Sequence, residues 1–321
     1  MPENFRLESG PVPEPGDGEV VLRTLYLSVD PYMRGRLRDV PSYAPPVQIG
    51  ELMTGGGVGR VIASRHPNFA VGDVLEGLTG WQTHCVSDGR MFRRVDETLA
   101  PVSTALGVLG MPGLTAYFGL LDICHPREGE TVLVSGAAGA VGSLVGQIAK
   151  IHGCRAVGIA GADDKVRWIT GDLGFDAAFN YKTVAGKDYR RAIASLCPQG
   201  VDVYFDNVGG PITDAVFPNL NLRGRVSICG QISQYNDETA VQGPRHLFHL
   251  IVKRAKVEGF LVMDYAERFK EGRAKLAGWL KDGRLQYREQ IVDGFENTPQ
   301  AFIGMLQGEN TGKMLVRVTT D

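Results

Sequence analysis

The sequence predicts an α/β protein in which a doubly wound parallel sheet accompanies a separate, β-rich domain. Three observations predict this fold class. Residues 131–152 have the pattern of a buried strand, a glycine-rich turn and an amphipathic helix. From residue 131 onward, short apolar runs alternate with helical stretches, which is typical of parallel sheets. Before residue 100, short strand-like runs are separated by turns that contain Gly and Pro, and the chain returns to β character near its end.

The first part of the chain is expected to form a compact, barrel-like β domain. After a polar leading segment over residues 1–18, strands are expected at 19–28, 57–63, 71–76 and 84–86. The next apolar stretch, residues 106–122, has helical spacing. Because proline cannot donate a backbone hydrogen bond, Pro112 is expected to kink or split this helix.

A regular succession of strands and helices begins at residue 131. The expected strands are 131–134, 155–160, 177–179, 201–205, 225–229 and 257–262. The expected helices are about 141–152, 164–173, 188–196, 211–219, 244–255 and 265–282. Gly153 stands where a glycine C-cap would end the first of these helices.

The last part of the chain is expected to complete the first domain. Strands are predicted at 287–292 and 313–318, with a helix at 298–306 between them. The predicted domains are therefore 1–107 together with 284–321, and 108–283.

The glycine-rich turn at residues 135–142 is predicted to bind a phosphate group. Its glycines follow the spacing G-x-x-G-x-x-G. A helix start carries unpaired N–H groups and partial positive charge, and glycines let the backbone approach a pyrophosphate closely. Glycine triplets also serve tight turns and close packing, but the strand before and the helix after favour a dinucleotide site. The residues expected at the diphosphate are Gly136, Gly139, Ala140, Val141 and Gly142.

Composition and charge argue against several functions. The length of 321 residues suggests about two domains, and an apolar content of 43% is enough to form hydrophobic cores. A net charge of −2 without a long basic stripe disfavours nucleic acid as a partner. No apolar run approaches the ~18 residues of a membrane-spanning helix, and the N-terminus does not resemble a signal peptide. Five scattered cysteines without a C-x-x-C pair favour a reducing cytoplasm.

Several motifs resemble those of zinc-independent medium-chain dehydrogenases/reductases. The motifs are residues 26–35 (YLSVDPYMRG), 136–142, 175–182, 204–210, 229–236, 294–297 and 308–313. Together they are similar to the prostaglandin reductase, leukotriene 12-hydroxydehydrogenase and plant alkenal double-bond reductase group, along nearly the whole chain. The resemblance implies a Rossmann domain, a discontinuous GroES-like domain and a homodimer. It also implies NADPH-dependent reduction of the C=C bond of α,β-unsaturated ketones or aldehydes.

The chain departs from that group in two places. It begins late, so the usual first strand of the β domain is expected to be missing. Gly136 also replaces an alanine that is common in relatives, a small change that we expect to leave phosphate binding intact.

The cofactor is predicted from the region after the second strand of the parallel sheet. Asp163 follows Gly142 by about 20 positions, the distance at which an acidic residue holds the ribose of NAD. The strand 155–160 leads into Ala-Gly-Ala, however, so we interpret Asp163 and Asp164 as N-cap residues of the next helix. Lys165 lies just inside that helix, where its ammonium group can meet the 2′-phosphate of NADPH. The alternative interpretation is that Lys165 is a solvated lysine on the surface with no role in cofactor binding.

The resemblance implies further cofactor contacts. Asn207, Cys229 and Gly230 lie at the carboxyl ends of expected strands, where open α/β sheets bind ligands. For Asn207, capping of its own turn fits the sequence equally well. Outside the glycine turn, the implied contacts are Lys165, Tyr181, Asn207, Cys229, Gly230, Ile232, Ser233, Tyr235, Phe260, Leu261, Val262 and Asn310.

A tyrosine is expected to assist the chemistry. Enone reduction requires a hydride at the β-carbon and a donor for the developing enolate oxygen, and a neutral tyrosine hydroxyl suits the second role. Tyr235, in the loop after the fifth strand, is the first candidate. Tyr32 and Tyr265 are second candidates, as walls of a substrate cleft. For each tyrosine taken singly, a packing role fits the sequence equally well.

No metal site is expected. Where zinc-dependent relatives carry a cysteine and a Gly-His-Glu sequence, this chain has Asp-Pro-Tyr at 30–32 and Gly-Glu-Leu at 50–52. The six histidines form no evident ligand set, because His246 and His249 lack a nearby cysteine.

Two alternatives to an enone reductase remain open on the sequence. The first is another oxidoreductase with the same fold and cofactor, either a quinone oxidoreductase or a dehydrogenase of hydroxy-lipids. The second is a non-catalytic NADPH-binding sensor. NADPH consumption with a panel of enones discriminates between a reductase and a sensor.

Overall fold

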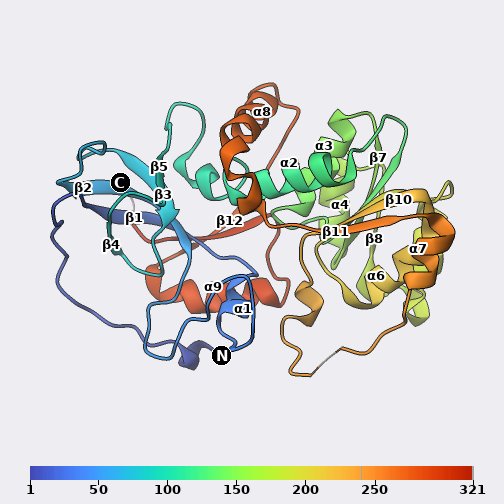
Figure 1. The fold of residues 1–321 in the computed structure, drawn as a ribbon, viewed down its shortest axis with the longest axis horizontal. Coiled ribbons are helices and arrows are strands. Elements are labelled where there is room, and N and C mark those ends of the chain that lie inside the picture. The colour runs from blue at the N-terminus through green and yellow to red at the C-terminus, as the bar shows by residue number, and fades with distance from the viewer. Residues whose placement is uncertain (240, 320–321) are drawn as a thin grey trace. The chain divides into compact units, whose positions relative to one another are not determined.

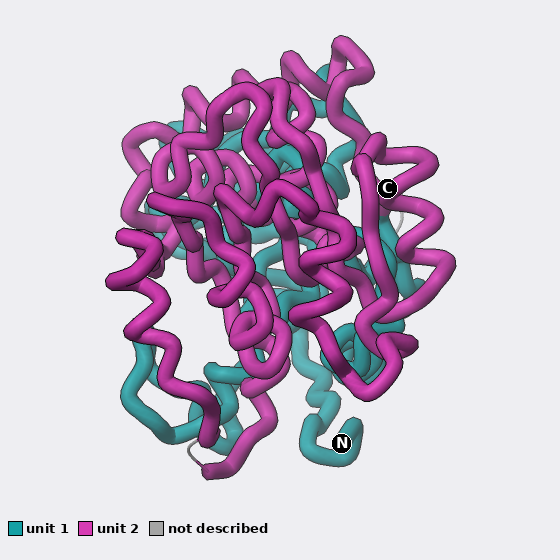
Figure 2. Tube along the Cα trace, turned by 90° about the vertical axis from the view of Figure 1, so that its right-hand side faces the viewer, with its two compact units in different colours: residues 1–110, 289–321 teal, residues 111–288 magenta. Residues whose placement is uncertain are grey.

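The computed structural model describes residues 1–239 and 241–319 and divides into two compact units (Figures 1 and 2). Unit 1 comprises residues 1–110 and 289–321, and unit 2 comprises residues 111–288. Unit 1 is thus built from two stretches of chain that lie on either side of unit 2 in the sequence.

Unit 2 contains a six-stranded parallel sheet. Its strands are β6 (Thr131–Ser135), β7 (Arg155–Ala160), β8 (Ala177–Asn180), β9 (Val201–Asp206), β10 (Leu220–Ile228) and β11 (Lys256–Gly259). They are arranged in the order β11-β10-β9-β6-β7-β8. Because the order reverses at β6, the sheet is doubly wound and its switch point lies between β6 and β9. The predicted fold class is confirmed.

Helices cover both faces of this sheet. They are α2 (Met111–Cys124), α3 (Gly142–Ile151), α4 (Asp163–Gly171), α5 (Tyr189–Leu196), α6 (Gly210–Val216), α7 (Leu247–Lys253) and α8 (Phe269–Lys281). In Figure 1, α2 and α3 lie on one side of the sheet and α6 on the other. Fully buried side chains of strands and helices form the core between them, among them Leu133, Val157, Ile193 and Val216.

Unit 1 is built on a seven-stranded sheet. Its strands are β1 (Val20–Ser28), β2 (Gly56–Ser64), β3 (Val74–Leu78), β4 (His84–Ser87), β5 (Phe92–Arg94), β12 (Glu289–Asp293) and β13 (Lys313–Arg317). The order is β12-β13-β1-β2-β3-β5, with β4 also paired to β1. Antiparallel pairing of Leu27 with Val316 joins the C-terminal stretch to the first strand. Two helices complete the unit, α1 (Met33–Arg36) and α9 (Thr298–Leu306).

Short 3-10 helices link these elements. They are η1 (Pro2–Asn4), η2 (Val102–Leu106), η3 (Tyr181–Thr183), η4 (Ala185–Lys187), η5 (Phe217–Asn219), η6 (Ile232–Gln234), η7 (Val262–Arg268) and η8 (Phe295–Asn297). No helix within residues 1–239 and 241–319 is long and apolar enough to cross a membrane.

The structure corrects two local predictions about helix starts. The helix expected over 106–122 begins only at Met111, so Pro112 lies in its first turn, where a missing N–H removes no hydrogen bond. The prediction that Pro112 kinks or splits the helix is therefore wrong. The N-cap of α4 is Ala162, not an aspartate. The carboxylate of Asp163 instead accepts a hydrogen bond from the Asn180 side chain at 2.8 Å.

Two further segments differ from the expected elements. The strand expected at 257–262 ends at Gly259, and the chain then enters η7, so the helix expected at 265–282 is divided into η7 and α8. β5 was not predicted, because three residues are too few for a period-2 pattern. By contrast, Gly153 follows the end of α3 with a φ of +74°, as the predicted C-cap requires.

Candidate cofactor and active site

The glycine turn closes tightly between β6 and α3. Gly136 has a φ of +60°, and the N–H of Gly139 donates to its carbonyl oxygen at 2.9 Å. A Cβ on Gly142 would lie 2.3 Å from the same oxygen, so only glycine fits there. The N-cap of α3 is Val141, which makes no side-chain cap. The start of α3 therefore presents backbone N–H groups without a capping side chain, as anion binding requires.

Asn207, which directly follows β9, is hydrogen-bonded to Ser135 at the start of this turn. Its backbone N–H donates to the Ser135 hydroxyl at 2.9 Å, and its side-chain amide donates to the Ser135 carbonyl oxygen at 2.8 Å. Asn207 is thus bonded across the switch point between β6 and β9, whereas the sequence also allowed a role confined to its own turn.

A buried carboxylate that sequence reasoning missed lies beside Asn207. Asp206 is 0% exposed at the end of β9. One oxygen accepts hydrogen bonds from Ser135 Oγ, Tyr204 OH and the N–H groups of Val208 and Gly209, at 2.9–3.0 Å. The other accepts from Thr213 Oγ1 at 2.7 Å and Gln231 Nε2 at 3.2 Å. An acidic residue at the end of an apolar strand was the available signal.

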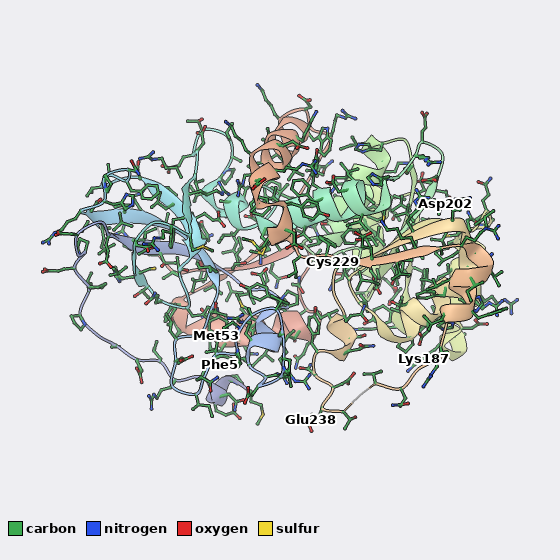
Figure 3. All side chains as sticks on the ribbon, viewed as in Figure 1. Phe5, Met53, Lys187, Asp202, Cys229 and Glu238 are labelled. Atoms are coloured by element: carbon green, nitrogen blue, oxygen red, sulfur yellow. The ribbon has the colours of Figure 1, made fainter. Side chains whose placement is uncertain are left out.

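The loop after β10 packs against the turn after β9. The N–H groups of Cys229 and Gly230 donate to the Asp206 carbonyl oxygen at 2.9 and 3.1 Å, and Cys229 stands where β10 ends (Figure 3). Ser233 donates to the Val208 carbonyl oxygen through both its N–H and its hydroxyl. Ile232 lies in the same loop, and its N–H donates to the Asn207 carbonyl oxygen at 3.4 Å.

Cys229 is held as a neutral thiol. Burial, together with the charge of Asp206, raises the pKa of its thiol to about 12. Because the thiolate is the nucleophilic form of cysteine, this side chain is unsuited to nucleophilic chemistry at neutral pH.

Tyr235 reaches back into its own loop. Its hydroxyl accepts a hydrogen bond from the Gln231 N–H at 3.3 Å. Burial raises the pKa of Tyr235, so the hydroxyl stays protonated at neutral pH. A phenol oxygen that accepts one hydrogen bond can still donate its own proton.

The two other tyrosine candidates have different surroundings. Tyr265 stacks on Phe118 with ring centroids 4.7 Å apart and meets Phe260 edge-on, which is a packing arrangement. Tyr32 belongs to unit 1, where burial, with help from Asp30, raises its pKa. The Lys313 ammonium group holds Asp30 through an ion pair of 3.0 Å.

The remaining predicted contacts lie in both units. Phe260 lies over Gly119, where a Cβ would come within 2.3 Å of its ring. Leu261 is 40% exposed, and Val262 begins η7. Asn310 is in unit 1, and its side-chain amide donates to the Gly312 carbonyl oxygen at 2.9 Å.

Two lysines gather at the carboxyl ends of β7 and β8. Lys165 is half-buried in the first turn of α4, and burial lowers its pKa, with a further lowering from the charge of Lys182. Tyr181 lies over Gly161, at 3.0 Å from the position of a Cβ there. Sequence reasoning missed Lys182, although a lysine directly after Tyr181 was a readable signal. This pair of cations suits a phosphate monoester, whose charge they complement.

Within the described residues, no group of three or more His, Cys, Asp or Glu side chains could hold a metal ion. His246 instead stacks on Phe217 with centroids 5.4 Å apart, and its Nε2 lies 3.5 Å from an oxygen of Asp214.

Comparison with known proteins covers nearly the whole chain. Residues 1–95 match the family model described as the N-terminal domain of oxidoreductase, and residues 140–278 match the one described as zinc-binding dehydrogenase. The NADPH-dependent curcumin reductase of Escherichia coli (strain K12) is 48% identical, over 100% of this chain and 94% of that protein. Prostaglandin reductase 1 of Bos taurus is 45% identical, over 98% and 94%. The NADP(+)-dependent 2-alkenal reductase of Nicotiana tabacum is 44% identical, over 97% and 90%.

A solved structure agrees with these relatives. The crystal structure of CurA from Vibrio vulnificus in complex with NADPH superposes with a TM-score of 0.94 and 47% identity, over 99% of this chain and 95% of that one. The resemblance read from the motifs is confirmed. The chain belongs to the medium-chain dehydrogenase/reductase family.

Proposed function

We propose that this protein reduces the C=C bond of α,β-unsaturated ketones or aldehydes with NADPH. The observation that carries the proposal is the tight glycine turn at the switch point, which leads into a helix start without a side-chain cap. The near full-length identity to a curcumin reductase, a prostaglandin reductase and a 2-alkenal reductase supports the same reaction. Bound NADPH would supply the hydride for the β-carbon of the substrate.

Unit 2 is the proposed NADPH-binding domain. Backbone N–H groups of Ala140, Val141 and Gly142 would hold the diphosphate, with Gly136 and Gly139 shaping the turn. At the adenosine end, the proposed 2′-phosphate contacts are Lys165, Lys182 and Tyr181. A cation pair there favours NADPH over NADH, which lacks that phosphate.

The turns after β9 and β10 are proposed to hold the nicotinamide end, since ligands bind at the carboxyl ends of strands beside a switch point. The residues in this role are Asn207, Cys229, Gly230, Ile232, Ser233, Phe260, Leu261 and Val262. Unit 1 is the proposed substrate domain, to which Tyr32 and Asn310 belong. Tyr265 is assigned to packing, given its stacked ring.

Tyr235 is the proposed donor to the enolate oxygen. Its raised pKa keeps the proton on the hydroxyl, and a neutral donor stabilises a developing oxyanion without being ionised itself. The enolate would then take a proton at its α-carbon from solvent.

The test is NADPH oxidation measured side by side with 2-alkenals, 15-oxo-prostanoid-like enones and quinones. We expect the enals and enones to be consumed and to yield saturated carbonyl products. A marked preference for quinones would favour a quinone oxidoreductase, and oxidation of hydroxy-lipids with NADP⁺ would favour a dehydrogenase. Tight NADPH binding without turnover of any substrate would favour a sensor.

We further propose that the protein is a homodimer formed through α7 and β11. Leu247, Phe248 and Ile251 of α7 are each at least 70% exposed, which is unusual for large apolar side chains. β11 lies at an edge of the sheet. Two-fold antiparallel pairing centred on Val257 would place Lys256 opposite Glu258 of a second copy, so the strand is self-complementary in charge.

All five cysteines are free thiols. This supports the cytoplasmic location expected from the sequence, where thiols are kept reduced.

A further inference from the structure

The Asp206 carboxylate and the Tyr235 hydroxyl are connected through a single residue, Gln231. The side-chain Nε2 of Gln231 donates to Asp206 Oδ2 at 3.2 Å, and its backbone N–H donates to the Tyr235 hydroxyl at 3.3 Å. We propose that Asp206 and Gln231 are positioning residues that fix the Tyr235 hydroxyl for the reaction. The inference rests on the proposed function, in which Tyr235 is the donor.

The carboxylate determines how the Gln231 side chain is oriented. The oxygens of Asp206 accept hydrogen bonds from Ser135, Tyr204 and Thr213, and the amide nitrogen of Gln231, not its oxygen, faces this carboxyl group. The same nitrogen donates to the Gly230 carbonyl oxygen at 3.1 Å. The amide of Gln231 is therefore held by Asp206, after β9, and by Gly230, after β10. Fixing this side chain also restrains the backbone of Gln231, whose N–H binds Tyr235.

Two glycines leave room for this arrangement. A Cβ on Gly209 would lie 2.2 Å from the amide oxygen of Gln231, and Gly209 has a φ of +73°. A Cβ on Gly230 would lie 3.1 Å from the Tyr235 hydroxyl. A side chain at position 209 would displace the amide of Gln231, and one at position 230 would displace the hydroxyl of Tyr235. The loop is thus built around the amide of Gln231 and the hydroxyl of Tyr235.

Gln231 can be altered without dismantling the buried site. Asp206 keeps its hydrogen bonds from Ser135, Tyr204 and Thr213 when the Gln231 amide is removed. Leucine matches the size of glutamine and lacks its amide, so Gln231→Leu removes the link from Asp206 to the loop. Gln234→Leu is the matched control, since Gln234 lies in the same turn and its side chain makes no hydrogen bond within the described residues.

The decisive experiment is a double-mutant cycle with Tyr235→Phe, measured on a 2-alkenal. We expect Gln231→Leu to lower kcat about 5–10-fold, with the KM for NADPH changed by less than about twofold, because misplacing a donor mainly weakens transition-state stabilisation. In the Tyr235→Phe background the same change should cost less than about twofold. Equal losses in both backgrounds would show a general effect on the loop and overturn the proposal.

A second measurement does not depend on activity. In protein labelled with 3-fluorotyrosine, the ¹⁹F resonance of Tyr235 is the one that Tyr235→Phe removes. We expect this resonance to shift in Gln231→Leu and to stay in place in Gln234→Leu. An unchanged resonance in Gln231→Leu would overturn the positioning role. A shifted resonance in an enzyme that reduces no enone would instead locate the failure in the proposed function.

Discussion

At the scale of single residues, Tyr235 is the proposed hydrogen-bond donor to the enolate oxygen. Tyr235→Phe removes one hydroxyl and keeps the ring, so we expect turnover to fall about 10²-fold while NADPH affinity changes little. Stopped-flow hydride transfer and a fluorescence titration with NADPH measure the two quantities separately. Because burial raises the pKa of Tyr235, activity should not decline with rising pH until above the usual tyrosine pKa of about 10. Unchanged turnover in Tyr235→Phe would refute its role as donor.

Lys165 and Lys182 are the residues proposed to make the protein prefer NADPH to NADH. Reversing either charge in Lys165→Glu or Lys182→Glu should weaken NADPH binding about 10–100-fold and NADH binding far less, because only NADPH has the 2′-phosphate. Dissociation constants for both cofactors, measured by fluorescence, test this expectation. Lys187→Glu is the matched control, since Lys187 is an exposed lysine on η4. Equal losses for NADPH and NADH would contradict the assignment.

The sequence predicts single residues well where their neighbours are local. Gly153 was predicted as a C-cap from its place after a helix, and its φ of +74° agrees. Asp206 was missed because its partners come from β6, β9, α6 and the loop after β10. The caps predicted for α4 failed because Asn180, 17 residues later, binds the Asp163 carboxylate. Hydrogen bonds between residues far apart in the chain cannot be predicted from the local spacing of residue types.

At the scale of elements, the turn between β6 and α3 is tightly constrained. Gly142→Ala would bring a Cβ within 2.3 Å of the Gly136 carbonyl oxygen, so the turn must open. We expect a loss of about 1–3 kcal/mol in the free energy of unfolding and weaker NADPH binding. Thermal and urea unfolding test the first effect. Gly171→Ala, where nothing lies within 4 Å of a Cβ, should change stability by less than about 1 kcal/mol. If the two variants behave alike, the turn is not constrained in this way.

α7 is the element on which the proposed dimer depends. Combining Phe248→Asp with Ile251→Asp should give a monomer, because charges would be buried between two copies. Light scattering after size-exclusion chromatography measures the mass. Leu99→Asp changes a residue of unit 1 that is 63% exposed, and it should leave the dimer intact. A dimer that survives the double substitution, or a wild-type monomer, would exclude this interface.

The sequence predicted those helices and strands whose apolar patterns extend over enough residues to be recognised. The helix at 298–306 and all six strands of the parallel sheet were predicted. For β6, β7 and β9 the apolar runs reflect burial on both faces of the sheet. β5 has only three residues, and the order of the strands of unit 1 depends on pairings such as Leu27 with Val316, which lie far apart in the chain. Such pairings between distant strands cannot be predicted from the spacing of residues along the sequence.

At the scale of the whole molecule, we propose that unit 2 binds NADPH and that unit 1 binds the substrate. In the proposed reaction, hydride reaches the β-carbon of an enone and not the carbonyl carbon. The most direct measurement uses NADPH deuterated at the transferred position, with a 2-alkenal as substrate, and locates the label in the product by NMR. We predict a saturated aldehyde with one deuterium on the former β-carbon. Deuterium on the carbonyl carbon of an unsaturated alcohol would contradict the account.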